Sequence, residues 1–161
     1  MKAVQIGAGL VGNIIANDMS DIFDVTVVDL NEKVLTSIKE KCPKLDTAVC
    51  SCTDEAGLTS IIKDADIITA GVPGRFGRKM METVIKAGKN LSDISFMPED
   101  FEELDGLAKE HGVTVVPDMG VAPGMSNFLM GRGASSLDEV ENATILLVVY
   151  LASRFHPSII R

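Results

Sequence analysis

The chain has 161 residues, 46% of them apolar, which suits one domain with a substantial core and excludes a disordered or fibrous protein. Its formal net charge of −8 speaks against nucleic acid or an anionic membrane as the main partner, because phosphate groups would repel it. No run approaches the roughly 20 apolar residues of a membrane span, and the glycine motif follows the N-terminus too closely to leave room for a signal peptide, so we expect a cytoplasmic protein.

Apolar runs alternate with amphipathic stretches along the chain, which predicts βαβ units and a parallel sheet. In the first half the pattern predicts strands at residues 2–6, 25–28 and 47–52. It predicts helices at residues 11–19, at 32–41, and from residue 53 or 54 to about 63. Asn31 is a suitable N-cap for the second of these helices and Pro43 ends it, while Thr53 or Asp54 caps the third.

The second half continues the same alternation. The pattern predicts strands at residues 65–70, 91–96 and 113–116, and helices at 78–86, from Pro98 to about 111, and at about 126–131. Gly88 occupies the position that a left-handed helix C-cap prefers. The whole pattern predicts an α/β fold with a doubly wound, Rossmann-type, mostly parallel sheet of six or more strands and helices on both faces.

The segment after the first strand matches the dinucleotide-binding pattern G-x-G-x-x-G, as Gly7-Ala8-Gly9-Leu10-Val11-Gly12. Gly7 would permit the sharp turn into the helix, Gly9 would let the backbone approach a pyrophosphate, and Gly12 would let the helix lie close to the strand. The free N–H groups at Leu10 and Val11 belong to the same helix start. A tight turn without a ligand is the alternative interpretation.

Asp29 ends the second strand about 20 residues after the glycines, where an acidic residue binds the adenosine ribose in such folds. A carboxylate at that position repels the 2′-phosphate of NADP, and neither Leu30 nor Asn31 supplies a guanidinium to compensate. Lys33 is the one nearby cation whose side chain could reach the 2′-phosphate. We therefore expect NAD as the cofactor, with NADP the less favoured choice.

Other strand ends should border the same crevice, because ligands of open α/β sheets bind beyond the carboxyl ends of the strands. The candidate strand ends are Cys52-Thr53-Asp54, Gly71-Val72-Pro73, Asp93 and Asp118-Met119-Gly120. Asp54 could bond near the adenine or serve only to cap its own helix. Asp93 lies inside a strand that otherwise reads as apolar, so it needs either a ligand or an internal hydrogen bond.

The three cysteines have no zinc-like spacing, and no motif of a zinc hydrolase, NTPase or serine hydrolase is present. Cys50 and Cys52 alternate along the predicted strand 47–52 and would share one face, as packed thiols or as a redox pair. No titratable residue has a partner at catalytic spacing, so the sequence assigns no catalytic residue and no metal ligand.

Beyond these single features, the chain resembles the saccharopine dehydrogenase-like family, and especially its lysine dehydrogenase and saccharopine reductase branch. The resemblance covers residues 1 to about 147 and is most specific in its second half. The matching stretches are residues 4–12, Asp29, Gly71-Val72-Pro73, Asp93, Met97-Pro98-Glu99-Asp100 and Val115-Val116-Pro117-Asp118-Met119-Gly120-Val121-Ala122-Pro123-Gly124-Met125-Ser126-Asn127.

The resemblance implies an oxidoreductase that acts on the CH–NH group of a lysine-related substrate and exchanges a hydride with a nicotinamide. It also implies that Pro123 and Gly124 lie close to the nicotinamide, with Asp93, Asp118 and Gly120 at the border of the same region. Lysine, saccharopine and other dibasic or carboxylated amines all remain as substrates. In the family a second domain supplies much of the substrate pocket and the dimer contacts.

The chain departs from the family pattern after residue 146, where Leu147-Val148-Val149-Tyr150-Leu151 stands in place of a typical Val-Gly-Gly-Leu-Pro run. A single-nucleotide deletion would produce this change, so we interpret residues 148–161 as a frameshifted tail and the substrate domain as absent. Reading the gene across this point tests the hypothesis. The exposed domain-facing surface would then favour homo-oligomers, and the chain alone would be inactive.

A stand-alone dinucleotide-binding module that senses redox state or regulates a partner is the alternative function. A short-chain-type reductase is disfavoured, because Tyr150 is the only tyrosine and has no lysine four residues after it.

Overall fold

The computed structural model describes residues 1–147, and the predicted frameshifted tail lies outside them. The chain divides into two compact units, Met1–Gly120 and Val121–Arg161, which we describe separately. The elements of the first unit are β1 (Lys2–Ile6), α1 (Leu10–Met19), β2 (Asp24–Asp29), α2 (Glu32–Lys41), β3 (Asp46–Val49), α3 (Glu55–Ile62), β4 (Ile67–Ala70), α4 (Gly74–Lys86), β5 (Leu91–Asp93), η1 (Phe101–Leu104), α5 (Asp105–Glu110) and β6 (Val115–Val116).

The six strands of the first unit form one parallel sheet in the order β3-β2-β1-β4-β5-β6. This order confirms the predicted doubly wound fold. The direction of strand succession reverses between β1 and β4, and a crevice opens at such a point because the connections leave to opposite faces. The residues that follow β1 and β4 therefore lie on either side of the expected ligand site.

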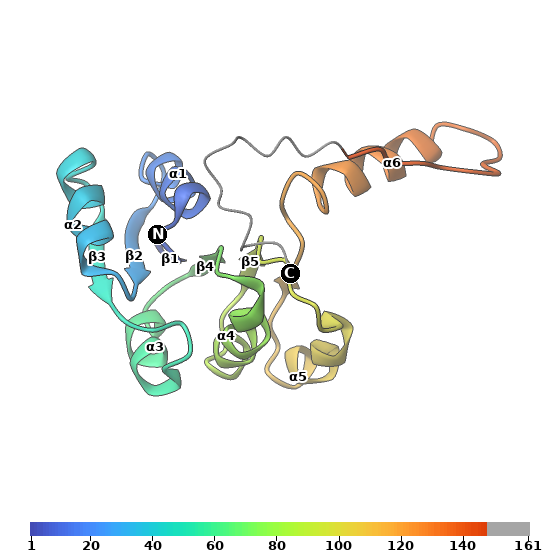
Figure 1. Cartoon of the computed structure of the whole chain (residues 1–161). Helices are drawn as coiled ribbons and strands as arrows, with labels where there is room; N and C mark the ends of the chain where they lie inside the picture. Colours follow the sequence, from blue (N-terminus) through green and yellow to red (C-terminus); the bar gives the residue numbers. More distant parts are fainter. Residues whose placement is uncertain (148–161) are drawn as a thin grey trace. The chain divides into compact units, whose positions relative to one another are not determined.

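Helices cover both faces of the sheet, as Figure 1 shows, with α1 and α2 on one side and α3, α4 and α5 on the other. The alternation of side chains along the strands divides the core accordingly. Ala3, Val25 and Val27 pack with α1 and α2, whereas the strand residues of opposite phase pack with α3, α4 and α5.

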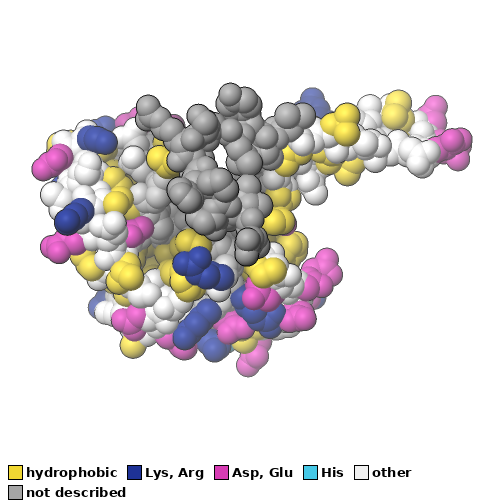
Figure 2. Space-filling view, viewed as in Figure 1, with side chains coloured by type: hydrophobic (Ala, Val, Ile, Leu, Met, Phe, Trp, Pro, Cys, Tyr) yellow, Lys and Arg dark blue, Asp and Glu magenta, His cyan; other side chains and the backbone are white. Residues whose placement is uncertain are grey.

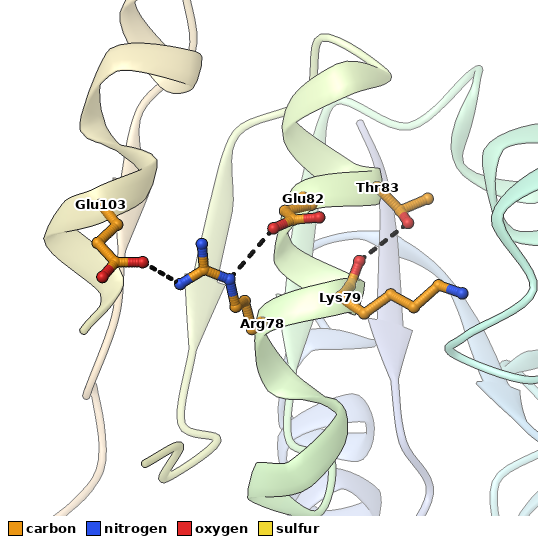
Figure 3. A network of polar contacts seen from close by, with 5 residues as sticks. All are labelled: Arg78, Lys79, Glu82, Thr83 and Glu103. Carbon is orange, nitrogen blue, oxygen red and sulfur yellow. Dashed lines mark hydrogen bonds and ion pairs between the residues drawn. The ribbon is translucent and has the colours of Figure 1, made fainter. Parts of the chain in front are cut away.

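An ion-pair network fastens the short η1 helix to α4 (Figure 3). The Arg78 guanidinium pairs with Glu82 on its own helix, over 3.3 Å, and also with Glu103 of η1. The two carboxylates hold the pKa of Arg78 above its usual value, mainly through the hydrogen bond with Glu103. One turn further along α4, the Thr83 hydroxyl donates to the Lys79 carbonyl.

The structure corrects the predicted third strand. It ends at Val49 rather than at residue 52, because the chain turns there: the Thr53 N–H bonds to the Ser51 hydroxyl and the Asp54 N–H to the Ser51 carbonyl. Cys50 and Cys52 therefore do not alternate along a strand, and both thiols are free. Burial raises the pKa of each thiol, which opposes thiolate formation.

The predicted strand 91–96 is also too long, because β5 ends at Asp93. The Asp93 carboxylate accepts the Ser95 backbone N–H and so diverts the chain from the sheet ladder. The helix predicted from Pro98 begins instead at Phe101 as a 3-10 turn, capped by Asp100, whose side chain accepts the Glu102 N–H.

The helix predicted at 78–86 begins four residues earlier, at Gly74, because a glycine there lets α4 approach the Phe96 carbonyl, where a Cβ would collide. The strands predicted at 65–70 and 113–116 are shorter than expected, and the helix predicted at 126–131 is longer, running over Met125–Ala134 as α6. Of the two candidate caps for α3, Asp54 fills the position.

The second unit contains α6, of which no residue is buried. The predicted extension of the Rossmann domain to residue 147 stays a prediction. Among the described residues, no helix is long and apolar enough to cross a membrane. Over the part of this face that the structure describes, Figure 2 shows acidic and basic side chains intermingled instead of a continuous basic patch.

Candidate functional site

The turn between β1 and α1 shows why two of its glycines are required by the fold. Gly7 has a φ of 93°, which L side chains rarely adopt, and a Cβ there would collide with the Gly71 carbonyl. A Cβ at Gly12 would collide with the Gly7 carbonyl oxygen. At Gly9, by contrast, none of the described residues other than its chain neighbours has an atom within 4 Å of a Cβ position. Gly9 is therefore the position that leaves space for a ligand.

The first turn of α1 presents its backbone N–H groups without a side-chain cap. The side chains of Asn31 and Asp54 accept such groups at the starts of α2 and α3. Leu10 and Val11, which begin α1, are 84% and 54% exposed. Unpaired donors at the positive end of a helix dipole favour an anion, so this helix start suits a pyrophosphate.

Asp29, the last residue of β2, is half-buried and connects the glycine turn to the neighbouring strand. One carboxylate oxygen accepts the Ala8 N–H and the other accepts the Asn31 N–H, each over 2.8 Å. Because each carboxylate oxygen has two lone pairs, both can still accept a hydroxyl hydrogen. The geometry therefore allows Asp29 to hold the turn and a ribose together.

A pocket of about 330 Å³ lies in front of this turn. It brings together six of the predicted residues, namely Gly7, Gly9, Asp29, Gly71, Val72 and Pro73. Cys52, expected at the strand end, also lines it, whereas Cys50, Ser51 and Phe76 line it and were missed. A correct end for β3 at Val49 would have pointed to Cys50 and Ser51, because they follow its carboxyl end.

Thr53 and Asp54 do not line this pocket. The Thr53 hydroxyl pairs with the Ser51 hydroxyl, and the Asp54 carboxylate accepts the Gly57 N–H over 3.1 Å. Asp54 thus serves as a helix cap in the structure. A place for Asp54 near the adenine, and cofactor binding by Thr53, stay predictions.

A larger cavity, of about 650 Å³, lies between α4, η1, α5 and β6. It contains none of the predicted site residues, and of the charged residues that line it, Glu102, Asp105 and Lys109, the last two form an ion pair. The start of α5 borders it without a side-chain cap, but no glycine lines it. Size alone therefore does not identify the site, and the chemistry favours the smaller pocket.

Asp93 lies at the end of β5 and is fully buried, with an exposed fraction of 0%. One carboxylate oxygen accepts both the backbone N–H and the hydroxyl of Ser95, over 3.0 and 2.7 Å. The Ser95 hydroxyl in turn accepts the Val72 N–H over 2.9 Å. Asp93 thus has an internal partner, and through Ser95 it supports the 71–73 loop of the pocket.

The second carboxylate oxygen of Asp93 has no hydrogen-bond partner among the described residues. Burial raises the pKa of Asp93 from 3.8 to about 6; the hydrogen bonds from Ser95 oppose this shift and the charge of nearby Asp118 adds to it. A carboxyl group with such a pKa can hold or release a proton near neutral pH.

The remaining predicted residues follow β6. Asp118 has a φ of 55°, a conformation uncommon outside glycine, and the next N–H, of Met119, donates to the Asp93 carbonyl. Gly120 ends the first unit. Pro123 and Gly124 belong to the second unit, where Gly124 precedes α6 with a φ of 127°. Their place beside a nicotinamide stays a prediction.

Comparison with known proteins gives the same result as the geometry. The family described as saccharopine dehydrogenase NADP binding domain matches residues 3–116. A curated saccharopine dehydrogenase (NADP⁺, L-glutamate-forming) from Pyricularia oryzae is 27% identical over 74 residues, which are 46% of this chain and 16% of that protein.

Solved structures share the fold. Apo saccharopine dehydrogenase (L-Glu forming) from Saccharomyces cerevisiae has a TM-score of 0.75 at 18% identity, covering 84% of this chain and 31% of that one. A probable dehydrogenase from Thermotoga maritima has a TM-score of 0.65 at 16% identity, covering 84% of this chain and 41% of that one. The chain thus spans less than a third of the yeast enzyme and about a sixth of the fungal relative.

Proposed function

The chain belongs to the saccharopine dehydrogenase NADP-binding domain family, and from this premise we propose that its dinucleotide occupies the pocket in front of the β1–α1 turn. The pyrophosphate lies against the N–H groups of Gly9, Leu10 and Val11, and Gly7 and Gly12 keep the turn tight behind it. One observation carries this proposal: an uncapped helix start, an open Gly9 and the Asp29 carboxylate meet in a single pocket.

The adenosine ribose is assigned to Asp29, and the loop of Gly71, Val72 and Pro73 borders the other side of the cofactor. The family takes its description from NADP, yet this chain carries a carboxylate where a 2′-phosphate would lie. At about 4 Å two like charges repel by about 1 kcal/mol in water and more near a protein surface. We therefore propose that NAD binds more tightly than NADP.

Asp29→Asn is expected to reduce the ratio of NADP to NAD dissociation constants by about tenfold, because it removes the charge repulsion from one cofactor only. Calorimetric titration with each cofactor measures this ratio. A general loosening of the turn would weaken both cofactors equally and would leave the ratio unchanged. Asp24→Asn, at the exposed opposite end of the same strand, is the matched control. An unchanged ratio in Asp29→Asn, or a wild-type preference for NADP, would contradict the assignment.

For the whole protein we propose an oxidoreductase in which a hydride passes from the carbon of a lysine-related CH–NH group to the nicotinamide and a proton is released. Asp93 is the last residue of β5, and Asp118 and Gly120 follow β6; the nicotinamide would lie beyond these strand ends, with Pro123 and Gly124 near it. The family supports this proposal. Because we expect the chain alone to be inactive, the assay uses the protein with the reading frame restored after residue 146. Absorbance of reduced nicotinamide, followed with lysine and with saccharopine, tests the proposal, and no change with either substrate would count against it.

A further inference from the structure

Gln5 is a polar residue in the middle of the buried strand β1, and its side chain is fully buried. Its Nε2 donates to the carbonyls of Ile6 and Gly7, over 2.9 and 3.1 Å. Its Oε1 accepts the Thr69 hydroxyl over 2.6 Å. All the hydrogen-bonding groups of this amide are thus used, and two of the three bonds reach the start of the glycine turn.

The peptide group between Gly7 and Ala8 is held at both ends by side chains. Gln5 of β1 holds its carbonyl oxygen, and Asp29 at the end of β2 holds its N–H. The Ile6 carbonyl, the other acceptor of Gln5, also receives the Gly71 N–H over 2.9 Å. Gln5 therefore orients the first peptide of the turn and, through it, the N–H groups that follow.

The rest of β1 offers no reason for an amide at this position. Its neighbours Ala3, Val4 and Ile6 are apolar and buried, and an apolar residue at position 5 would avoid the cost of burying a polar group. The carbonyl that Gln5 holds is also the atom that limits Gly12 to glycine. The amide is placed where it controls the distance between β1, the turn and α1.

We propose that Gln5 is a positioning residue for the pyrophosphate-binding turn, an inference that rests on the proposed function. It does not touch the ligand. Its bond to the Gly7 carbonyl fixes the orientation of that peptide, so that the following N–H groups face the pocket before the dinucleotide arrives. A preorganised turn binds more tightly because less of the binding free energy is spent on ordering it.

The test separates affinity from stability by comparing two substitutions that both break the hydrogen bond between Gln5 and Thr69. Gln5→Met removes the bonds to Ile6 and Gly7 and is expected to weaken NAD binding about tenfold. Thr69→Val removes only the hydroxyl behind the amide, so affinity should stay within about twofold of wild type although the melting temperature falls. Calorimetry gives the affinities and thermal unfolding gives the stabilities.

The double variant Gln5→Met/Thr69→Val sharpens the comparison. With both polar partners replaced by apolar groups, part of the lost stability should return, whereas NAD affinity should stay at the level of Gln5→Met. Thr83→Val is the matched control, since it removes a buried hydroxyl from α4 whose only bond among residues 1–147 is to the Lys79 carbonyl. Recovery of affinity together with stability in the double variant would overturn the inference.

A measurement on the unaltered chain covers the case in which the variants do not fold. The Gln5 side-chain NH₂ resonances should shift when NAD is added, because their acceptor belongs to the turn that receives the pyrophosphate. No shift at saturating NAD would overturn the positioning role alone. Failure of the unaltered chain to bind NAD or NADP would overturn the proposed function and this inference with it.

Discussion

Gly9→Val is expected to leave the first unit folded and to weaken NAD binding by about a hundredfold or more. Gly9 has an extended backbone, with φ of −64° and ψ of −171°, which valine tolerates. Apart from its chain neighbours, no described residue has an atom within 4 Å of the Cβ position, so the new side chain extends into the space in front of the α1 start. Two lost contacts to a charged group, at about 1.5–3 kcal/mol each, account for a hundredfold loss or more.

Gly106→Val provides the matched control for this substitution. Gly106 is exposed on α5 and also has no atom within 4 Å of a Cβ position, but it lies far along the chain from the glycine turn. Calorimetric titration of both variants with NAD, together with their unfolding curves, makes the comparison. Near-normal NAD affinity in Gly9→Val would mean that the pyrophosphate does not approach the helix start at this residue.

The second large effect is a dependence of stability on pH that resides in Asp93. Its pKa is about 6 in the folded chain against 3.8 for an ordinary aspartate, so on acidification the folded state takes up this proton before the unfolded state does. The contribution of Asp93 to the free energy of unfolding therefore rises as pH falls from about 7 to about 4. A shift of about two pH units corresponds to ~3 kcal/mol.

Asp93→Asn isolates this contribution, because asparagine is neutral over the whole range and can still accept the Ser95 hydrogen bonds. The free energy of unfolding of the variant minus that of the wild type should fall by up to ~3 kcal/mol between pH 8 and pH 4, because only the wild type gains stability on protonation. Urea unfolding at several pH values measures that difference, in which the other carboxylates cancel. A difference that stays constant with pH, or that changes in the opposite direction, would contradict the account.

The fold could be predicted from the sequence because its main signal is local. Short apolar runs alternating with amphipathic stretches identify βαβ units, and the predicted sheet is present in the structure. The predicted ends of two strands were wrong because side chains there form hydrogen bonds with the backbone. Asp93 captures the Ser95 N–H and ends β5 early, and Ser51 turns the chain after β3. Neither hydrogen bond can be recognised from the hydrophobic pattern, because the pattern continues past both strand ends.

The same distinction applies to the site. Gly7, Gly9, Gly12 and Asp29 could be found because their spacing is a property of the chain itself. Gln5 could not, because one of its hydrogen-bond partners, Thr69, lies 64 residues away in sequence and beside it in the sheet.

Ser95 depends in the same way on Val72, 23 residues earlier. A polar residue inside an apolar strand was the available signal for Gln5. The same signal was used for Asp93, and the structure shows that its partner is internal. The family assignment made from the residues is confirmed, and it rests mainly on the first unit, where the family match lies.

The central claim is that the dinucleotide binds at the start of α1, and amide chemical shifts measured by NMR during titration of the unaltered chain with NAD test it most directly. We predict saturable shifts at Gly9, Leu10 and Val11, with none at Ala108 and Val115, which line the larger cavity. Shifts confined to the larger cavity, or no saturable shift at the α1 start, would contradict the account.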